Sequence, residues 1–156
     1  MRHKTGKILN NKESGCAVMS GSEERLSGKK VLVVDDNCII ALHLSQLLTR
    51  LGCLCVKAQT GFEAIEIIKD DSGVDAVLLD LEMPYLDGVA TMKIIKEIKK
   101  KIPVIANTGY CDEYCTDTLL CSGFDDVISK PIQEFILVDK IDKLLSRFTG
   151  ISDKHN

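Results

Sequence analysis

The chain has 156 residues and a formal net charge of −3, with 45% hydrophobic and 28% charged residues. This is the composition of an ordinary globular domain, so a chain that is disordered throughout is excluded. The length corresponds to one domain with a short tail to spare. The slightly acidic balance and an aromatic content of 4% argue against a nucleic-acid-binding body, which would carry a basic face or a stacking platform.

The charge and the polarity are unevenly divided along the chain. Residues 1–29 carry six basic and three acidic residues, and the rest of the chain carries 14 basic and 20 acidic ones. The first 28 residues are rich in Ser, Gly, Asn and Lys and show no helical or strand periodicity. We therefore expect a flexible leader over residues 1–28, one domain over residues 29–150 and a tail over residues 151–156.

The sequence contains neither an apolar signal segment near its N-terminus nor a run of about 18 apolar residues. Seven cysteines are an odd number, which cannot pair completely within one chain. We therefore expect a cytoplasmic protein with free thiols and without a membrane partner.

The first half of the expected domain alternates between short apolar runs and helical repeats. Residues 31–34 form an unbroken apolar run, which is typical of a strand buried on both faces of a parallel sheet. Apolar residues then recur at helical spacing over 39–51, and Gly52 ends that helix. We expect a second strand over 53–58 and a second helix, opened by a Thr-x-x-Glu capping box, over 60–69.

The second half continues the alternation. Asp36 or Asn37 can cap the first helix, and Asp87 can cap the third. The expected elements are strands at 76–79, 103–106 and 126–129, a loop at 81–87, and helices at 88–99, 112–121 and 133–148. Five strands that alternate with five helices predict an α/β domain with a parallel sheet and right-handed crossovers.

Polar side chains follow four of these strands. Asp35 and Asp36 end the first strand, Asp80 the third, Thr108 the fourth and Lys130 the fifth. Ligands of an open α/β sheet bind beyond the carboxyl ends of its strands. Three carboxylates gathered there repel one another, and Mg²⁺ relieves this repulsion while leaving room for a phosphoryl oxygen. Because a carboxylate can attack phosphorus, the set favours phosphoryl transfer onto an aspartate over acid/base hydrolysis.

Each of these residues also has an ordinary structural interpretation when it is considered alone. An aspartate after a strand is most often a helix cap or a turn residue, and a lysine there is usually a solvated cation. Several like charges at one edge lower stability unless a ligand compensates for them. Their joint occurrence at four strand ends therefore favours a functional site.

The ordered set of motifs resembles the receiver domain of two-component response regulators over residues 30–149. The matching segments are Val31–Asn37, Ala76–Pro84, Leu86–Gly88, Pro103–Thr108 and Ser129–Pro131. The resemblance implies a flavodoxin-like, doubly wound sheet of five parallel strands in the order 2-1-3-4-5, with five helices.

The resemblance implies roles for the acidic residues. Asp80 is expected to accept a phosphoryl group from a phosphohistidine. Mg²⁺ is the expected cofactor, held by Asp35, Asp36, Asp80 and the backbone carbonyl of Glu82. The chain would then be a phosphoacceptor that assists its own phosphorylation and dephosphorylation, and not an enzyme that acts on an external substrate.

Lys130 is expected to pair with Asp80 before phosphorylation and with the phosphoryl group afterwards. Thr108 is expected to move toward the phosphoryl oxygen and to report the phosphorylated state. The bond between Lys130 and Pro131 is expected to be cis. One position departs from the pattern, because many receivers carry Tyr or Phe where this chain has Val127.

The partners implied by the resemblance are a histidine kinase or a histidine phosphotransfer protein, a downstream protein target, and a second copy of the chain on phosphorylation. Neither nucleic acid nor membrane is expected to bind directly. The output surface is expected on residues 112–121 and 133–148. No DNA-binding or enzymatic segment follows Phe148, so we expect another protein, or domains outside this sequence, to read the signal.

Three alternatives stay open. The stretch Asp80–Pro84 is similar to receivers attached to hybrid sensor histidine kinases, so the chain could be such a fragment. A haloacid-dehalogenase-like phosphatase also uses a strand-end aspartate with Mg²⁺ and a lysine, although its Asp-x-Asp motif fits this sequence poorly. A pseudo-receiver that acts only as an interaction scaffold is the third alternative, and Val127 keeps it open.

Overall fold

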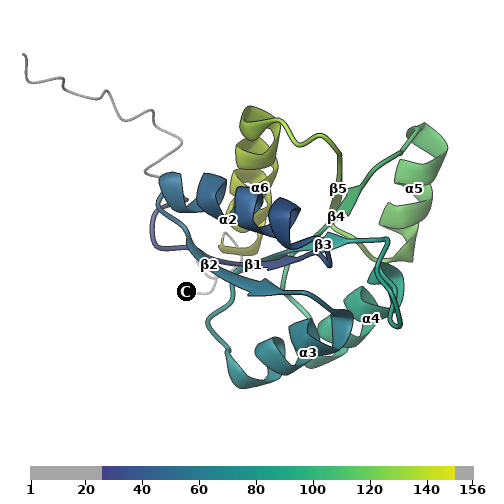
Figure 1. Ribbon diagram of the computed structural model, residues 1–156, viewed down its shortest axis with the longest axis horizontal. Coiled ribbons are helices and arrows are strands. Elements are labelled where there is room, and N and C mark those ends of the chain that lie inside the picture. The colour runs from purple at the N-terminus through teal and green to yellow at the C-terminus, as the bar shows by residue number, and fades with distance from the viewer. Residues whose placement is uncertain (1–25, 150–156) are drawn as a thin grey trace, which may run out of the picture.

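The computed structural model describes residues 26–149. Strands and helices alternate strictly along this part of the chain (Figure 1). The elements are β1 (Lys30–Val34), α2 (Cys38–Arg50), β2 (Leu54–Ala58), α3 (Gly61–Asp70), β3 (Ala76–Asp80), α4 (Gly88–Ile98), β4 (Val104–Thr108), α5 (Glu113–Ser122), β5 (Asp126–Ser129) and α6 (Glu134–Thr149).

The five strands form one parallel sheet in the order β2-β1-β3-β4-β5. The predicted α/β class and the predicted strand order are therefore confirmed. The order reverses direction between β1 and β3, so the carboxyl ends of these two neighbouring strands lie at the topological switch point, where open sheets of this kind bind ligands.

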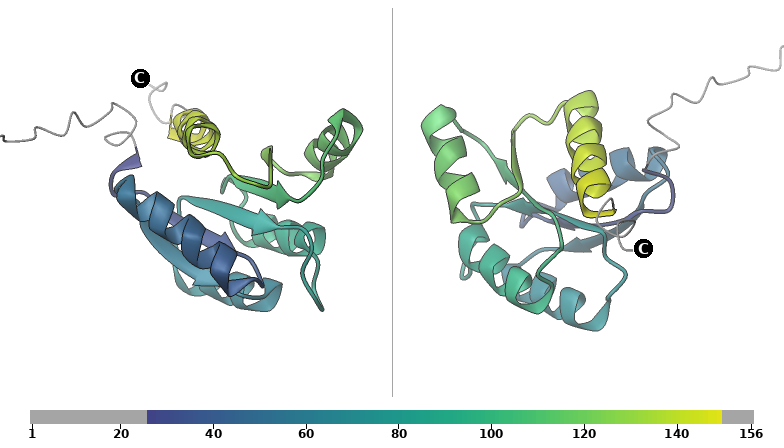
Figure 2. Two further views of the ribbon diagram at one scale, coloured as in Figure 1. Left: turned by 45° about the horizontal axis from the view of Figure 1, so that its top comes forward. Right: turned by 180° about the vertical axis from the view of Figure 1, so that it is seen from behind.

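Two helical layers cover the sheet. Helices α2 and α6 pack on one face, and α3, α4 and α5 pack on the other (Figures 1 and 2). Side chains alternate between the two layers along each strand. In β1, Val31 and Val33 point to the α2/α6 side, whereas Leu32 and Val34 point to the α3–α5 side. This burial on both faces explains why the strand is an unbroken apolar run.

Capping side chains fix the first residues of α2 and α4, and so fix where the loops before these helices end. The side chain of Asn37 accepts hydrogen bonds from the backbone N–H groups of Ile39 and Ile40, at 3.0 and 3.3 Å. Asp87 caps α4 in the same way through Ala90. Of the two residues that could cap α2, the cap is therefore Asn37, which leaves the carboxylate of Asp36 available at the sheet edge.

The packed domain extends further toward the N-terminus than residue 29. Leu26 is completely buried and belongs to the core beneath α2 and α6. The Gly28 N–H donates a hydrogen bond to the Gly52 carbonyl at 2.9 Å, and the Cys53 thiol donates to the Leu26 carbonyl at 3.6 Å. The remaining parts of the expected leader and tail, residues 1–25 and 151–156, lie outside the described residues.

Within residues 26–149, no helix combines the length and the apolar character needed to cross a bilayer. The cysteines of this part of the chain are free thiols. The peptide bond between Lys130 and Pro131, directly after β5, is cis as expected.

Candidate phosphoacceptor site

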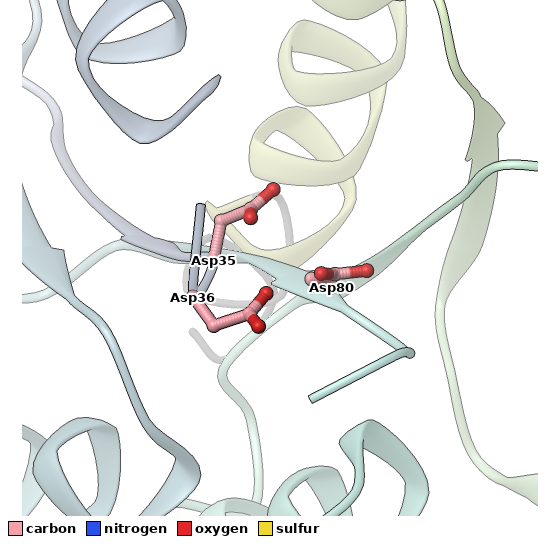
Figure 3. A group of neighbouring side chains, drawn as sticks. All are labelled: Asp35, Asp36 and Asp80. Carbon is pink, nitrogen blue, oxygen red and sulfur yellow. The ribbon is translucent and has the colours of Figure 1, made fainter. Parts of the chain in front are cut away.

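Three carboxylates meet at the carboxyl ends of β1 and β3. Asp35 and Asp36 directly follow β1, and Asp80 is the last residue of β3. One oxygen atom from each carboxylate lies within 4.8 Å of the other two (Figure 3). Asp35 and Asp80 are 1% and 4% exposed, whereas Asp36 is exposed to solvent. The cluster therefore consists of two buried carboxylates and one carboxylate that is exposed to solvent.

Lys130, which directly follows β5, supplies the countercharge. Its Nζ atom lies 3.3 Å from Asp35 Oδ2 and 3.3 Å from Asp80 Oδ1. Burial alone would lower the pKa of Lys130, but the charges of Asp80 and Asp35 outweigh burial and raise this pKa. The lysine is therefore held in its ammonium form between the two buried carboxylates.

The environment of Asp80 does not fully compensate its charge. Burial is the largest effect and raises the pKa of Asp80, and it outweighs both the Glu82 N–H, which donates to Asp80 Oδ1 at 3.2 Å, and the Lys130 charge. The carboxylate of Asp35 adds to the rise. The ionised form of Asp80 is thus less favourable than in water, and a hard cation beside it would relieve this penalty.

Backbone contacts hold the carboxylates in place. The Asn37 N–H donates to Asp35 Oδ1 at 2.9 Å. The segment after β3 is fixed by the start of α4, where the Gly88 N–H donates to the Leu81 carbonyl at 3.3 Å. A Cβ atom on Gly88 would lie only 2.5 Å from the Asp80 carbonyl oxygen, so α4 approaches β3 this closely only because residue 88 is a glycine.

Thr108 ends β4 at the same edge of the sheet and is buried. Its hydroxyl donates a hydrogen bond to the Tyr110 carbonyl at 3.2 Å, and its own carbonyl accepts from the Lys130 N–H at 2.8 Å. The structure therefore brings Asp35, Asp80 and Lys130 into direct contact, and it places Thr108 beside them with its hydroxyl engaged in the β4–α5 loop.

The position at which many receivers carry an aromatic residue is filled by a small one. Val127 is 7% exposed and packs in the core on the α3–α5 side of the sheet. Tyr110 is 79% exposed and lies outside that core.

One buried polar residue at this edge was not singled out in the sequence. Asn107 precedes Thr108 on β4, is 1% exposed, and its Oδ1 atom has no hydrogen-bond partner. A polar residue directly after the apolar run 104–106 was the available signal. The strand expected at 103–106 extends to Thr108 in the structure, so Asn107 lies inside β4.

A parallel sheet in this order, with an acidic cluster and a lysine at its switch point, defines a receiver-type α/β signalling domain. A family model described as "Response regulator receiver domain" matches residues 31–142. The chain belongs to the response regulator receiver domain family. It is therefore a phosphoacceptor signalling domain of the two-component type and not a classical enzyme.

Curated relatives place such domains within much longer proteins. The chain is 35% identical over 158 residues to "Hybrid signal transduction histidine kinase L" of Dictyostelium discoideum, covering 87% of this chain and 9% of that protein. It is 35% identical over 101 residues to "Transcription factor SKN7" of Candida albicans, covering 65% of this chain and 18% of that protein. The chain thus spans less than a fifth of either relative.

Solved structures share the fold over almost their full length. The receiver domain of Francisella response regulator 1452 superposes with a TM-score of 0.71 at 31% identity, covering 77% of this chain and 98% of that one. A chain of the CheX-CheY-BeF₃-Mg²⁺ complex from Borrelia burgdorferi gives a TM-score of 0.71 at 28% identity, covering 76% of this chain and 90% of that one.

Proposed function

We propose that Asp80 accepts a phosphoryl group from a phosphohistidine, and that Lys130 and Thr108 respond to the charge that arrives. The observation that carries this proposal is the position of Lys130 Nζ, 3.3 Å from both Asp35 and Asp80, beside three carboxylates within 4.8 Å of one another. An ion pair that served only stability would not need two further acidic groups at the same edge.

The donor set fits Mg²⁺, which prefers oxygen ligands and usually keeps several waters. Asp35, Asp36, Asp80 and the backbone carbonyl of Glu82 would hold the ion. When bound, Mg²⁺ offsets the carboxylate charges and offers a ligand position to a phosphoryl oxygen. The exposure of Asp36 leaves the site open on the side from which a phosphodonor would approach.

The transfer step uses the carboxylate of Asp80 as the nucleophile. One of its oxygen atoms forms a bond to phosphorus while the P–N bond to the donor imidazole breaks, and the imidazole leaves with that electron pair. The Lys130 ammonium then pairs with the phosphoryl oxygens instead of with Asp80. The Thr108 hydroxyl leaves the Tyr110 carbonyl, 3.2 Å away, and donates to a phosphoryl oxygen.

The same residues would assist loss of the phosphoryl group to water, so the domain would limit the lifetime of its own signal. The phosphodonor would be a histidine kinase or a histidine phosphotransfer protein, and the reader a downstream protein or a second copy of the chain. Its cysteines are free thiols in the part that the structure describes, which supports work in a reducing compartment such as the cytoplasm.

A second arrangement has its own support. The match to a hybrid histidine kinase of Dictyostelium discoideum favours a receiver that works as one module of such a kinase. The chemistry at Asp80 would be the same, but the phosphohistidine would then belong to the same polypeptide or to its dimer partner.

The test is Mg²⁺-dependent phosphorylation by acetyl phosphate, followed by intact-protein mass spectrometry. We expect wild type to gain one phosphoryl group and Asp80→Asn to gain none. Asp117→Asn is the matched control, because it removes the same charge from an exposed position on α5. A wild type that gains no phosphoryl group, or an Asp80→Asn variant that gains as much, would contradict the proposal. Hydrolysis of many equivalents of a phosphomonoester would instead favour a phosphatase.

A further inference from the structure

Asn107 is a buried amide whose side-chain oxygen has no partner. The residue is 1% exposed, and Oδ1 makes no hydrogen bond. Leaving a buried acceptor unpaired lowers stability, and such groups are rare in native proteins. A partner that arrives only in another state of the protein would explain why the residue is polar.

The register of the sheet shows on which face Asn107 lies. Asn107 pairs with Asp80 on β3 and with Ile128 on β5. Residues in register on neighbouring parallel strands point to the same face. Leu78, Ile105 and Ile128 belong to the core beneath α2 and α6, so Asp80 and Asn107, two residues further along β3 and β4, also point to that side.

Lys130 has to cross β4 on this same face. The lysine follows β5, whereas its partners Asp35 and Asp80 lie at the ends of β1 and β3, on the other side of β4 in the sheet order. Asn107 is the β4 residue that lies between β3 and β5 at this level. The lysine side chain therefore has to pass over β4 on the face where Asn107 lies to reach the carboxylates.

The donors of Lys130 and the acceptor of Asn107 are complementary. An ammonium group has three N–H donors. Asp35 accepts a hydrogen bond from one of them at 3.3 Å, and Asp80 Oδ1 lies 3.3 Å away as an ion-pair partner. Formation of an acyl phosphate turns the attacking oxygen of Asp80 into an ester-type oxygen and removes the full negative charge from that carboxyl group. The electrostatic attraction between Asp80 and Lys130 therefore weakens in the same step in which the ammonium turns toward the phosphoryl group.

We propose that Asn107 is a positioning residue, whose amide oxygen accepts a hydrogen bond from Lys130 once Asp80 carries a phosphoryl group. The amide keeps the ammonium over β4, between the phosphoryl oxygens and Asn107, and so prevents it from returning to Asp35. This inference rests on the proposed function and deepens it. It concerns the phosphorylated state, so it leaves Mg²⁺ binding by the resting protein unchanged.

The test compares two substitutions of equal shape, Asn107→Val and Asn107→Thr, because only threonine retains a polar atom. The measurement is the affinity for beryllofluoride, a mimic of the phosphoryl group, in saturating Mg²⁺ by isothermal titration calorimetry. We expect Asn107→Val to bind about 10-fold more weakly than wild type, since a hydrogen bond to a charged group is lost, and Asn107→Thr to recover part of the loss. The affinity for Mg²⁺ alone is expected to stay the same in both variants.

A buried-polar control and a double-mutant cycle separate positioning from packing. Thr91→Val removes a different buried polar group, the Thr91 hydroxyl on α4, and should leave beryllofluoride affinity unchanged. In a Lys130→Met background, Asn107→Val should cause no further loss, because Asn107 acts through the lysine. An equal loss in both backgrounds, or equal affinities for Asn107→Val and Asn107→Thr, would overturn the inference.

The outcomes also distinguish this inference from the proposed function. If wild type binds no beryllofluoride in Mg²⁺, the proposed phosphoacceptor role of Asp80 is contradicted. If wild type binds and Asn107→Val binds equally well, only the role of Asn107 is overturned. Thermal denaturation of each variant precedes the titrations, and Asn107→Ala replaces the valine variant if that variant does not fold.

Discussion

Asp36 offers a test of the acidic cluster that needs no phosphodonor. One of its oxygens lies within 4.8 Å of oxygens from Asp35 and Asp80. Because Asp36 is exposed, the dielectric constant of water applies, and each repulsion amounts to about 0.9 kcal/mol at that distance. Attraction to Lys130 offsets part of the two repulsions. We therefore expect Asp36→Asn to raise the free energy of unfolding by about 1 kcal/mol in the absence of divalent cations.

Magnesium should reverse this order of stability. A ligand that binds only the folded state stabilises it by about 2.7 kcal/mol when its concentration is 100 times its dissociation constant. Wild type offers three carboxylates, and Asp36→Asn offers two. The variant is therefore expected to gain much less from Mg²⁺, so that wild type becomes the more stable protein at saturation.

The assay is urea unfolding followed by far-UV circular dichroism at low ionic strength, once with EDTA and once with Mg²⁺. Asp117→Asn again serves as the control, since it makes the same change in net charge on α5. An Asp36→Asn variant that is no more stable than wild type in EDTA, or that gains as much stability from Mg²⁺, would refute repulsion within the acidic cluster. Equal stabilisation by Asp117→Asn would show that net charge, and not the cluster, is responsible.

Three further substitutions test the surroundings of the site. Gly88→Ala should destabilise the fold by about 1–3 kcal/mol and weaken Mg²⁺ binding in a calorimetric titration, because its Cβ would lie 2.5 Å from the Asp80 carbonyl oxygen; unchanged stability and affinity would contradict this. Leu26→Ala should lower the free energy of unfolding in urea by about 2–5 kcal/mol, because the leucine is buried in the domain core. A decrease as small as that for an exposed residue would show that Leu26 is not part of the domain core. The pKa of Asp71 is lowered, chiefly by its hydrogen bond from Lys30. Its stabilisation is therefore present above the ordinary aspartate pKa and is lost as the pH falls through the lowered pKa. Asp71→Asn should destabilise the fold at pH 7 and should destabilise it progressively less as the pH falls below the ordinary aspartate pKa; a pH-independent effect in urea unfolding would exclude the ion pair.

The sequence predicted the strands well because their burial on both faces leaves a simple pattern. The first and third strands are unbroken apolar runs, and each ends at the aspartate that closes it, Asp35 and Asp80. The carboxyl ends of neighbouring parallel strands must share an edge, so the meeting of these side chains followed from the topology. Their contacts with Lys130, 3.3 Å from each, follow because β5 ends at the same edge and the long lysine side chain spans β4.

Features that depend on tertiary contacts could not be predicted in this way. Leu26 is an isolated apolar residue in a polar segment, and it is buried only because α2, α6 and the residues around Gly52 close over it. Asn107 lies inside β4, which pairs with β5 up to its last residue, whereas the apolar run expected as this strand covers only residues 103–106. Neither residue belongs to a helical or strand pattern of apolar residues from which its burial could be predicted.

The residues expected to respond to a phosphoryl group lie on both faces of the sheet. Asp80, Asn107 and the Lys130 side chain lie toward α2 and α6, and strand alternation turns Thr108 toward α3–α5. On that second side the core contains Val127, 7% exposed, so no bulky ring at this position has to move when Thr108 turns. The bond that Thr108 must release is the one to the Tyr110 carbonyl. The first structural consequence of phosphorylation on this face is therefore expected in the β4–α5 loop, next to the start of α5.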